Sequence, residues 1–532
     1  MSIDAHAANR RKNHIFATAN QSDLTMLYPI GQHSFENIRE GGWAYVDKTE
    51  LIYRLTRGYG CYFLQRPRPF GKSLLVSTID AYFRGKKSLF EGLAIYDLEK
   101  DWLEYPVLHM DLTGAYHRPD SLREALNYTL TRWEEGYGVK PRTDSPELRF
   151  AEVIKAACRK TGRRVVILVD ECFKPVIDTV GNAKLCEEFR ETLDAFYSVT
   201  KAQDEFIRFA FFTSVSRVVN GSPFSGFNNL VDISMDYEWN NLCGVDAKEL
   251  KLYFSESVRE LAAAAGMSED KCYRKLSECY GGYHFSAGSE ETYDPSSLLR
   301  VFKEKEFHSH WSAVSMTPFL AKLMKKESVN LASLPGLRCR KSVLSLLDPQ
   351  FVDYRSLLYQ NGYLTLNGYD DRFRKYTLDY PNICVKMGFL NFLLDYCLPE
   401  GSCVFWVWGS DLCMGEIGRF MGNVKRVFAD HTYKNTETCL MEFRNAMYVI
   451  FEQVGRYAKV EWIEREKRLH LFVDASEYKY MLDIEFDSSI DEAFVNIENA
   501  VPAFAGESDK VFRIAMNFST ASGRIDGWKV KE

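Results

Sequence analysis

The distribution of apolar and polar positions predicts an α/β core in the N-terminal half of the chain. Residues 60–65 (GCYFLQ) form a short apolar and aromatic run that is typical of a buried strand. Residues 73–85 (SLLVSTIDAYFRG) carry apolar side chains at helical spacing. Residues 163–171 (RRVVILVDE) hold five consecutive apolar residues, the pattern of a strand buried on both faces of a parallel sheet. Together they predict a strand, a loop, a helix and a second strand of the same sheet.

The pattern changes beyond this predicted core. Residues 241–345 are rich in helical patterns, and 247–266 (AKELKLYFSESVRELAAAAG) is amphipathic, with Gly266 placed to end the helix. Residues 346–400 predict a helix, a hairpin at 362–381 and a second helix, which is winged-helix-like patterning. Such a wing either contacts DNA or packs against the neighbouring helices.

The C-terminal part predicts a third arrangement. Residues 437–455 (ETCLMEFRNAMYVIFEQVG) form a helix with its apolar side chains on one face. Three strands, a helix and a fourth strand follow. They span 458–465, 468–475, 478–487, 489–504 and 510–519, in that order.

Composition narrows the class of protein. The chain has 532 residues, of which 46% are hydrophobic and 14% aromatic, and this content supports packed cores and argues against disorder. The net charge of -6 argues against a dominant nucleic-acid-binding surface, so any such surface is local. Thirteen cysteines without a C-x-x-C pair indicate reduced thiols rather than disulfides or zinc.

The chain shows no targeting pattern. Its apolar runs fall short of the ~18 residues needed to span a bilayer. Residues 1–25 lack the apolar centre of a signal peptide and predict a polar, mobile tail. These features predict a cytoplasmic protein without membrane association.

The loop after the first predicted strand ends in Gly71-Lys72-Ser73, as a phosphate-binding loop does. The pattern G-x-x-x-x-G-K-[ST] requires a glycine five residues before Gly71, and this chain has Arg66 there. At a helix start, backbone N–H groups can receive phosphate oxygens. Lys72 would supply a positive charge for the β- and γ-phosphates, and the Ser73 hydroxyl would bind Mg²⁺. The alternative is an ordinary strand-to-helix turn.

Asp170 and Glu171 end the second buried strand, where open α/β sheets bind ligands. This is a Walker B pattern, in which Asp170 would hold Mg²⁺ through water and Glu171 would polarise the attacking water. A strand that ends in an acidic turn is the alternative. The two patterns in this order favour an NTPase that binds ATP and Mg²⁺.

These motifs make the chain resemble a bacterial family, common in Bacteroidota, that joins an AAA-ATPase-like region to a C-terminal PD-(D/E)XK nuclease-like domain. The family loop reads roughly R-P-R-R-F-G-K-S, and residues 66–73 read RPRPFGKS. The family motifs Y-V-D-K-T and L-I-D-E-Y-D-K-P appear as YVDKT (45–49) and LVDECFKP (168–175), with Phe173 in place of the second aspartate. Further landmarks match at 211–218, 223–234, 280–285, 293–299 and 362–366.

The resemblance extends to the nucleotide contacts. Arg66 and Arg68 are expected to flank the phosphates with permanent charge. The segment FFTSVSRV matches a family strand ending in T-G-V-S-K, whose polar residues are placed to sense the γ-phosphate. Arg217 in this segment joins Asp170 and Glu171 as a predicted catalytic residue. The predicted nucleotide-binding residues are Arg66, Arg68, Phe70, Gly71, Lys72, Ser73 and Leu74, and the predicted metal ligands are Ser73 and Asp170.

The resemblance also implies a second site. In the family's nuclease-like domain, one strand carries R-x-D, the next ends in E-F-K, and the following helix carries a glutamine. The Asp and Glu bind Mg²⁺ and the Lys orients water. Here these positions read RLH (468–470), EFD (485–487) and asparagine, so most of the set is changed. The residues of this degenerate site are His470, Glu485, Asp487 and Asn496.

Three outcomes stay open for that site. The domain is a degenerate nuclease fold kept for recognition or as a scaffold, or it retains Mg²⁺-dependent cleavage. Alternatively, His470, Glu485 and Asp487 bind a transition metal, since imidazole and carboxylate suit such ions.

The predicted fold class is α/β: a P-loop NTPase core with a helical lid and a winged-helix-like segment, followed by an α/β PD-(D/E)XK-like domain. The predicted boundaries are 1–25 for the tail, 26–240 for the ATPase core, 241–345 for the lid, 346–400 for the winged segment and 401–532 for the nuclease-like domain.

The predicted function is an ATP-binding and ATP-hydrolysing molecular switch coupled to a degenerate nuclease-fold domain. The alternatives are an active ATP-regulated, metal-dependent nuclease acting on foreign or mobile nucleic acid, and an interaction protein with an inactive ATPase site. The expected partners are the nucleotide and, through the C-terminal domain, nucleic acid or a protein. An oligomer is compatible with this class of ATPase.

Overall fold

A computed structural model describes residues 26–531 apart from 59, 219–229, 310–316, 346, 350, 398–404, 430–435, 456–458, 466–467, 476 and 499–509. The tail predicted at 1–25 and most of the landmark at 223–234 lie outside the described residues. The described residues divide into two compact units. The first comprises those within Met1–Trp311 and Gly336–Val385, and the second those within Ser312–Pro335 and Lys386–Glu532.

The first unit is built on a parallel sheet of five strands in the order β2-β3-β4-β1-β5. β4 lies between β1 and β3, and it pairs Ser214 with Gln65 and Phe212 with Val169. The carboxyl ends of these three strands therefore meet at one edge of the sheet, where parallel sheets bind ligands. The α/β prediction for this region is confirmed. The strands are β1 (Cys61–Gln65), β2 (Val107–Asp111), β3 (Val165–Asp170), β4 (Ile207–Ser214) and β5 (Leu230–Asp232).

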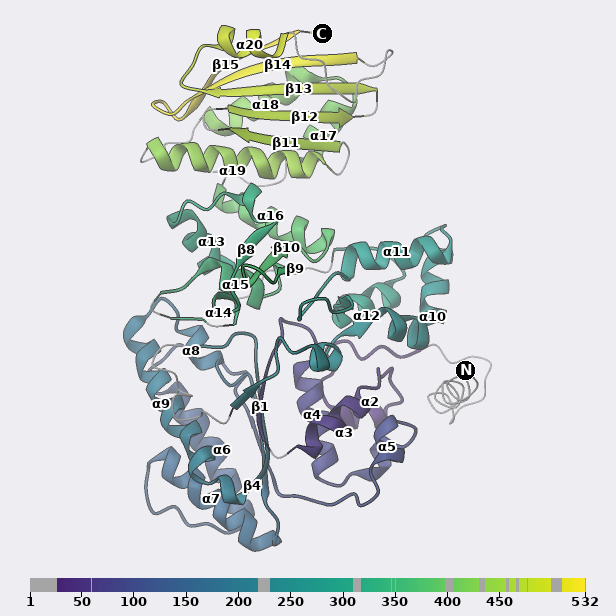
Figure 1. Ribbon diagram of the computed structural model, residues 1–532, viewed down its shortest axis with the longest axis vertical. Coiled ribbons are helices and arrows are strands. Elements are labelled where there is room, and N and C mark those ends of the chain that lie inside the picture. Colours follow the sequence, from purple (N-terminus) through teal and green to yellow (C-terminus); the bar gives the residue numbers. More distant parts are fainter. Residues whose placement is uncertain are drawn as a thin grey trace. The chain divides into compact units, whose positions relative to one another are not determined.

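Helices cover both faces of this sheet, with α6, α7 and α9 on one side and α2 to α5 on the other (Figure 1). This explains why β3 is buried along its whole length. α4 begins directly after the Gly71-Lys72 loop and packs Val76 and Ile79 into the core of the sheet. The helices are α2 (Phe35–Glu40), α3 (Thr49–Arg57), α4 (Lys72–Phe83), α5 (Ala94–Leu98), α6 (Ser121–Tyr137), α7 (Pro146–Thr161), α8 (Lys174–Asp178) and α9 (Ala183–Ala202), with 3-10 turns η1 (Lys87–Phe90), η2 (Asp204–Phe206) and η3 (Tyr237–Leu242).

Three further helices of the first unit pack around their own apolar core, in the region predicted as a helical lid. α10 begins with a capping box in which Asp246 and Glu249 each accept a backbone N–H from the other. One apolar cluster joins the three helices. It contains the fully buried side chains Val258, Leu276 and Leu298, one from each helix. The elements are α10 (Ala247–Ala264), α11 (Glu269–Tyr280) and α12 (Pro295–Glu304), with the short strands β6 (Val245–Asp246) and β7 (Thr292–Tyr293).

The last part of the first unit contains the predicted hairpin. β9 and β10 pair antiparallel, and β8 extends them to a sheet in the order β8-β10-β9. Thr365 ties the hairpin to the segment after α11, because its hydroxyl accepts the His284 N–H (2.7 Å) and donates to the His284 carbonyl (3.0 Å). The elements are β8 (Leu337–Cys339), α14 (Lys341–Leu344), α15 (Tyr354–Gln360), β9 (Thr365–Asp370) and β10 (Lys375–Asp379).

The second unit contains another five-stranded sheet, in the order β11-β12-β13-β14-β15, in which only β13 and β14 run parallel. The predicted order of helix, three strands, helix and strand is present, and β15 is an additional strand. On one face Phe443 of α19 packs against Phe486 and Phe518, with ring centroids 5.8 and 3.8 Å apart. On the other face Ala493 of α20 packs on Ala515. The strands are β11 (Lys459–Arg465), β12 (Arg468–Ala475), β13 (Tyr478–Phe486), β14 (Lys510–Ser519) and β15 (Arg524–Lys531); the helices are α13 (Thr317–Lys326), η4 (Leu331–Ser333), α16 (Ile383–Cys397, which starts in the first unit), α17 (Phe405–Cys413), α18 (Ile417–Ala429), α19 (Thr436–Val454) and α20 (Ile490–Glu498).

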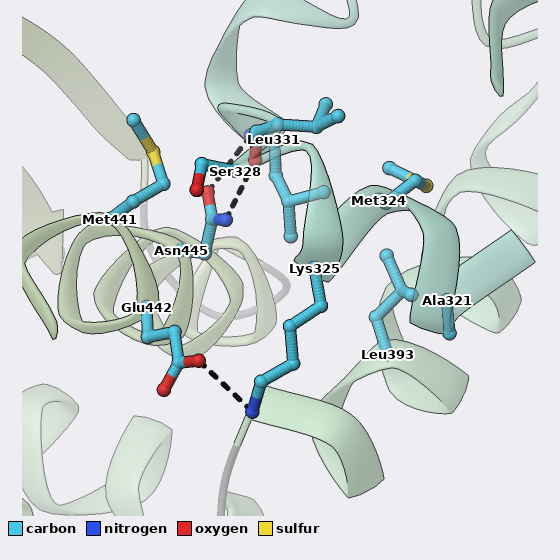
Figure 2. A pocket seen from close by; sticks show the side chains of 10 residues that line it. Ala321, Met324, Lys325, Ser328, Leu331, Leu393, Met441, Glu442 and Asn445 are labelled. Carbon is cyan, nitrogen blue, oxygen red and sulfur yellow. Dashed lines mark hydrogen bonds and ion pairs between the residues drawn. The ribbon is translucent and has the colours of Figure 1, made fainter. Parts of the chain in front are cut away.

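A small cavity of about 40 Å³ lies in the second unit between α13 and α19 (Figure 2). Beside it, Lys325 and Glu442 form an ion pair of 3.0 Å. The Asn445 amide accepts the Leu331 N–H (2.9 Å) and donates to the Val329 carbonyl (2.8 Å). These polar groups are engaged with one another and join α13 to α19, so we assign them a structural role.

Candidate functional site

The loop between β1 and α4 has the backbone shape that its sequence predicts. Gly71 is the residue before α4 and adopts φ 89°, a left-handed conformation that side chains other than glycine rarely tolerate. Lys72 begins the helix, and its ammonium group donates to the carbonyls of Arg66 (3.0 Å) and Pro67 (3.4 Å). The lysine is therefore folded back over the loop, with only 5% of its surface exposed.

The Walker B residues lie beside this lysine. Glu171 Oε1 is 3.3 Å from Lys72 Nζ, and both side chains are buried. Glu171 has φ 55°, an uncommon conformation for a residue with a side chain, and such conformations concentrate at functional sites. The structure thus brings together a cation from the loop after β1 and a carboxylate from the end of β3.

The intervening strand β4 supplies a residue that sequence reasoning missed. The Thr213 hydroxyl donates to Asp170 Oδ1 (2.5 Å) and accepts the Glu171 N–H (3.4 Å). The Val215 N–H donates to Glu171 Oε2 (3.3 Å). β4 therefore fixes the position of both carboxylates. A threonine at the end of the strand predicted after Walker B is the available signal, since it belongs to the FFTSVSRV segment.

Arg66 is engaged inside the protein, contrary to the prediction that it flanks the phosphates. Its guanidinium is fully buried, donates to the carbonyls of Gln65, Ser234, Trp239 and Asn240, and stacks 4.2 Å from the Phe285 ring centroid. Burial lowers the pKa of Arg66. The physical reason for the correction is that five N–H donors in a fixed fork suit a set of converging carbonyls. Arg66 occupies the position of the first glycine in the P-loop pattern, and its hydrogen bonds anchor the loop to the core.

The other loop residues divide between anchoring and exposure. Phe70 is buried and packs edge-on against Tyr283 and Phe285, with ring centroids 4.7 and 5.1 Å away. The landmark segment 280–285 therefore packs against the loop through these two aromatic side chains. Arg68 is exposed, whereas Ser73 and Leu74 are partly buried in the first turn of α4. Of the predicted contacts, Arg68 and Ser73 stay available to a ligand, and Phe70 serves the core.

A mainly apolar cavity of about 100 Å³ adjoins the loop. One wall comes from the loop and α4 and includes Gly71 and Leu74, and another comes from α10 and α12 and includes Phe254 and Leu299. Residues 44–46, within the predicted YVDKT landmark and just before it, close a third side. A cavity of this character, next to the loop predicted to bind phosphate, suits a flat, weakly polar ring such as a nucleobase.

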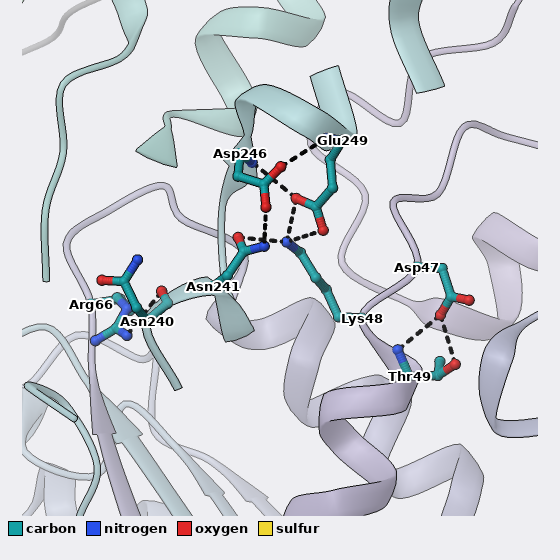
Figure 3. Close-up of polar contacts among 8 residues, drawn as sticks. All are labelled: Asp47, Lys48, Thr49, Arg66, Asn240, Asn241, Asp246 and Glu249. Atoms are coloured by element: carbon teal, nitrogen blue, oxygen red, sulfur yellow. Dashed lines mark hydrogen bonds and ion pairs between the residues drawn. The ribbon is translucent and has the colours of Figure 1, made fainter. Parts of the chain in front are cut away.

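A partly buried polar cluster forms around Lys48, which also lines this cavity (Figure 3). Lys48 Nζ donates to both oxygens of Glu249 (2.6 Å) and to Asn241 Oδ1 (2.8 Å), which links the YVDKT landmark to the start of α10. Asp47 instead accepts the N–H (2.8 Å) and the hydroxyl (2.6 Å) of Thr49, the first residue of α3. Burial raises the pKa of Glu249. The sequence marks Lys48 only as part of a landmark, and its partner lies 201 positions away.

Arg217, which the sequence predicts as a sensor of the γ-phosphate, is paired with a carboxylate of the protein in the structure. Its guanidinium pairs with Asp232 of β5 (2.5 Å) and lies 5.7 Å from the Phe63 ring centroid. Phe173, at the position of the family's second aspartate, is fully buried against the same ring. A sensor role for Arg217 stays a prediction, and it requires the pair with Asp232 to open.

In the second unit, the residues of the predicted degenerate site have separate partners. The pairing of β12 with β13 sets His470 opposite Asp483, with Nδ1 and Oδ1 3.2 Å apart, and sets Arg468 opposite Glu485. Asp487 lies beyond the end of β13 and accepts the N–H (2.8 Å) and hydroxyl (2.6 Å) of Thr520.

His470, Glu485 and Asp487 therefore do not converge as a set of metal ligands. Within the part of the chain that the structure describes, no group of three or more His, Cys, Asp or Glu side chains is arranged to hold a metal ion. The side chain of Asn496 lies outside the described residues.

Comparison with known proteins identifies the family of the chain. A family model described as "Predicted AAA-ATPase" (AAA-ATPase_like) matches residues 29–224. A protein named "Uncharacterized protein in vnfD 5'region" from Azotobacter chroococcum mcd 1 is 34% identical over 384 residues, which is 71% of this chain and 71% of that protein. The chain belongs to the predicted AAA-ATPase-like family. Membership supports ATP binding and an ATPase-like function.

The residues of this AAA-ATPase-like chain fit both the nucleotide and its usual Mg²⁺. The Ser73 hydroxyl and the Asp170 carboxylate are oxygen donors of the kind that Mg²⁺ binds. Asp170 is already oriented by Thr213, as ligating carboxylates usually are by a neighbouring group. Among the helices of the described residues, none has both the length and the apolar character needed to cross a membrane.

Proposed function

We propose that this AAA-ATPase-like protein is a molecular switch that binds and hydrolyses ATP at the loop after β1. The observation that carries the proposal is the position of Lys72, which contacts two loop carbonyls and Glu171 at the joint end of β1, β4 and β3. Anionic phosphate oxygens are stronger partners for an ammonium group than neutral carbonyls are. We therefore expect Lys72 to exchange the carbonyls for phosphate when ATP binds.

The remaining residues have distinct expected roles. Mg²⁺, when bound by Ser73 and Asp170, neutralises phosphate charge. Glu171 accepts a proton from the attacking water, and Thr213 and the Val215 N–H keep the two carboxylates in place. The base occupies the cavity between α4 and α12.

The switch is expected to act through α10. The Lys48–Glu249 pair connects the wall of the base cavity to the first turn of that helix. Because an ordered ligand biases packed elements between discrete arrangements, nucleotide binding is expected to change the packing of α10 to α12.

We further propose that the C-terminal sheet is a degenerate PD-(D/E)XK-like fold used for recognition of a protein or nucleic acid. The order of α19, β11 to β13, α20 and β14 supports the fold. The pairing of Asp487 with Thr520 and of His470 with Asp483 argues against a catalytic carboxylate set. We expect the protein to act in the cytoplasm.

Titration with ATP and Mg²⁺ tests the main proposal. Lys72→Ala removes the charge that faces the phosphates, so we expect binding to weaken by ~3 kcal/mol, or about a hundredfold. Lys140→Ala, a change at an exposed lysine, is the matched control and leaves the affinity unchanged. Wild-type affinity in a folded Lys72→Ala protein contradicts the proposal.

The base cavity has its own test. Leu299→Trp fills the cavity from α12 and is expected to weaken ATP binding while leaving inorganic triphosphate binding unchanged. Equal loss for both ligands, measured by calorimetry, would place the base elsewhere.

A further inference from the structure

Two cysteine thiols meet at the end of α11. Cys279 lies in the last turn of α11 and Cys384 in the first turn of α16, and both are partly exposed and free of disulfides. Their side chains are hydrogen-bonded to each other. Both also pack against the apolar cluster at the centre of α10, α11 and α12.

The backbone around this pair is held together by contacts that do not involve sulfur. The Asn382 side-chain amide donates to the Gly281 carbonyl (2.9 Å). Gly282 adopts φ 77°, and an added Cβ there would lie 1.8 Å from the Pro381 carbonyl oxygen. The chain segments that carry the two thiols are therefore in direct contact. A disulfide requires this closeness, since it forms without backbone movement only between neighbouring residues.

We infer that Cys279 and Cys384 form a redox-active dithiol, which a low-molecular-weight disulfide oxidises to an intramolecular disulfide between α11 and the start of α16. The inference does not depend on the proposed ATPase function. It concerns a modification site distinct from the nucleotide loop.

The chemistry proceeds by two thiol–disulfide exchanges. The hydrogen bond with Cys384 and burial raise the pKa of the Cys279 thiol. We assign the first attack to Cys384. The Cys384 thiolate attacks a small disulfide RSSR, forms a mixed disulfide and releases RS⁻, which takes up the proton that Cys384 lost. Cys279 then attacks the Cys384 sulfur, and the second RSH leaves with the Cys279 proton. The protein sulfurs lose two electrons, and RSSR becomes two RSH.

Partial exposure separates this pair from the fully buried cysteines among the described residues. Cys172 and Cys272 are fully buried, and burial raises the pKa of both thiols. A thiol with no exposed surface is inaccessible to a disulfide in solution. Cys158 is partly exposed on α7 and is not part of the pair, so it serves as the matched control.

The experiment maps peptides from the full-length native protein after incubation with glutathione disulfide. Trypsin cleavage after Lys275 and Arg300 releases Cys279 in peptide 276–300, and cleavage after Lys375 and Lys386 releases Cys384 in peptide 376–386. Each peptide contains one cysteine. We expect a cross-linked pair of these two peptides, with loss of both free peptides and recovery of both on reduction.

The variants decide between pairing and independent oxidation. Cys279→Ser and Cys384→Ser are expected to abolish the cross-link, and Cys279→Ser should retain glutathione on Cys384. Cys158→Ser should leave the cross-link unchanged. Separate glutathione adducts on both peptides of the wild type, or modification no faster than at Cys158, would overturn the inference. The wild-type map alone suffices if a variant fails to fold.

Discussion

The two five-stranded sheets of this protein place their carboxylates in different surroundings. In the first sheet, Asp170 and Glu171 lie where β3 ends, next to the lysine of the preceding loop. In the second sheet, Asp483 and Glu485 lie within β13, which is paired on both sides. The first pair of carboxylates adjoins the loop predicted to bind phosphate, whereas the second lies opposite residues of the neighbouring strands.

This difference shows that the chemistry of a carboxylate motif depends on its position in the sheet as well as on its residue types. A carboxylate at a parallel strand end shares that edge with the ends of neighbouring strands, so Thr213 of β4 and Lys72 can orient it. A carboxylate inside an antiparallel pair is opposed by a fixed cross-strand residue, as His470 opposes Asp483. We therefore expect chemistry at the first sheet and recognition at the second.

The largest expected effect tests chemistry at the first sheet. Glu171→Gln keeps the shape of the side chain but cannot accept a proton, so turnover of ATP should fall by ~10²–10⁴-fold. ATP affinity should change far less. Phosphate release and ATP titration measure the two quantities, and unchanged turnover would mean that another group activates water.

A smaller effect is expected from the anchor of the loop. Arg66→Lys loses the fork that donates to several carbonyls, so the free energy of unfolding of the first unit should drop by about 1.5–3 kcal/mol. Arg68→Lys, two residues away and exposed, is the control and should change it by less than ~0.5 kcal/mol. Thermal unfolding followed by calorimetry compares the two. Equal changes in the free energy of unfolding would mean that Arg66 does not anchor the loop.

Two neighbouring residues of β4 test whether this strand orients the carboxylates of the first sheet. Thr213→Val removes the hydroxyl that donates to Asp170, and we expect a loss of about 1–3 kcal/mol of stability together with slower hydrolysis. Ser214→Ala is the matched control, because the described structure gives its buried hydroxyl no hydrogen-bond partner. If both variants behave alike, the threonine does not orient the carboxylates.

The smallest expected effect concerns the second sheet. Glu485→Ala should leave ATP turnover unchanged, and neither the wild type nor the variant should cleave plasmid or single-stranded DNA with Mg²⁺ or Mn²⁺, with or without ATP. Cleavage by the wild type that disappears in the variant would make the protein an ATP-regulated nuclease and erase the contrast between the sheets.

Sequence reasoning succeeded where a property depends on local order. The strand-loop-helix around Gly71 and the order of elements from α19 to β14 follow from periodicity alone. It failed where a side chain's role depends on a distant partner. Arg66 is an anchor because the carbonyls of Ser234 and Trp239 converge on it, and no local pattern encodes that convergence.

The partners of the side chains at the second site could not be predicted for a related reason. Strand positions were predicted correctly, but the pairing of β12 with β13 decides which side chains face one another. His470 therefore meets Asp483 rather than Glu485. Asp487, one residue past the strand end, turns toward Thr520.

The anchoring of the loop also constrains the order of folding during synthesis. Arg66 donates to the carbonyl of Trp239, 173 positions later, and Phe70 packs against Phe285, later still. A nascent chain that has produced only β1 and α4 therefore lacks the partners that shape the loop, and such distant contacts form late. We expect ribosome-bound fragments to acquire nucleotide affinity only after residue 285 has left the exit tunnel.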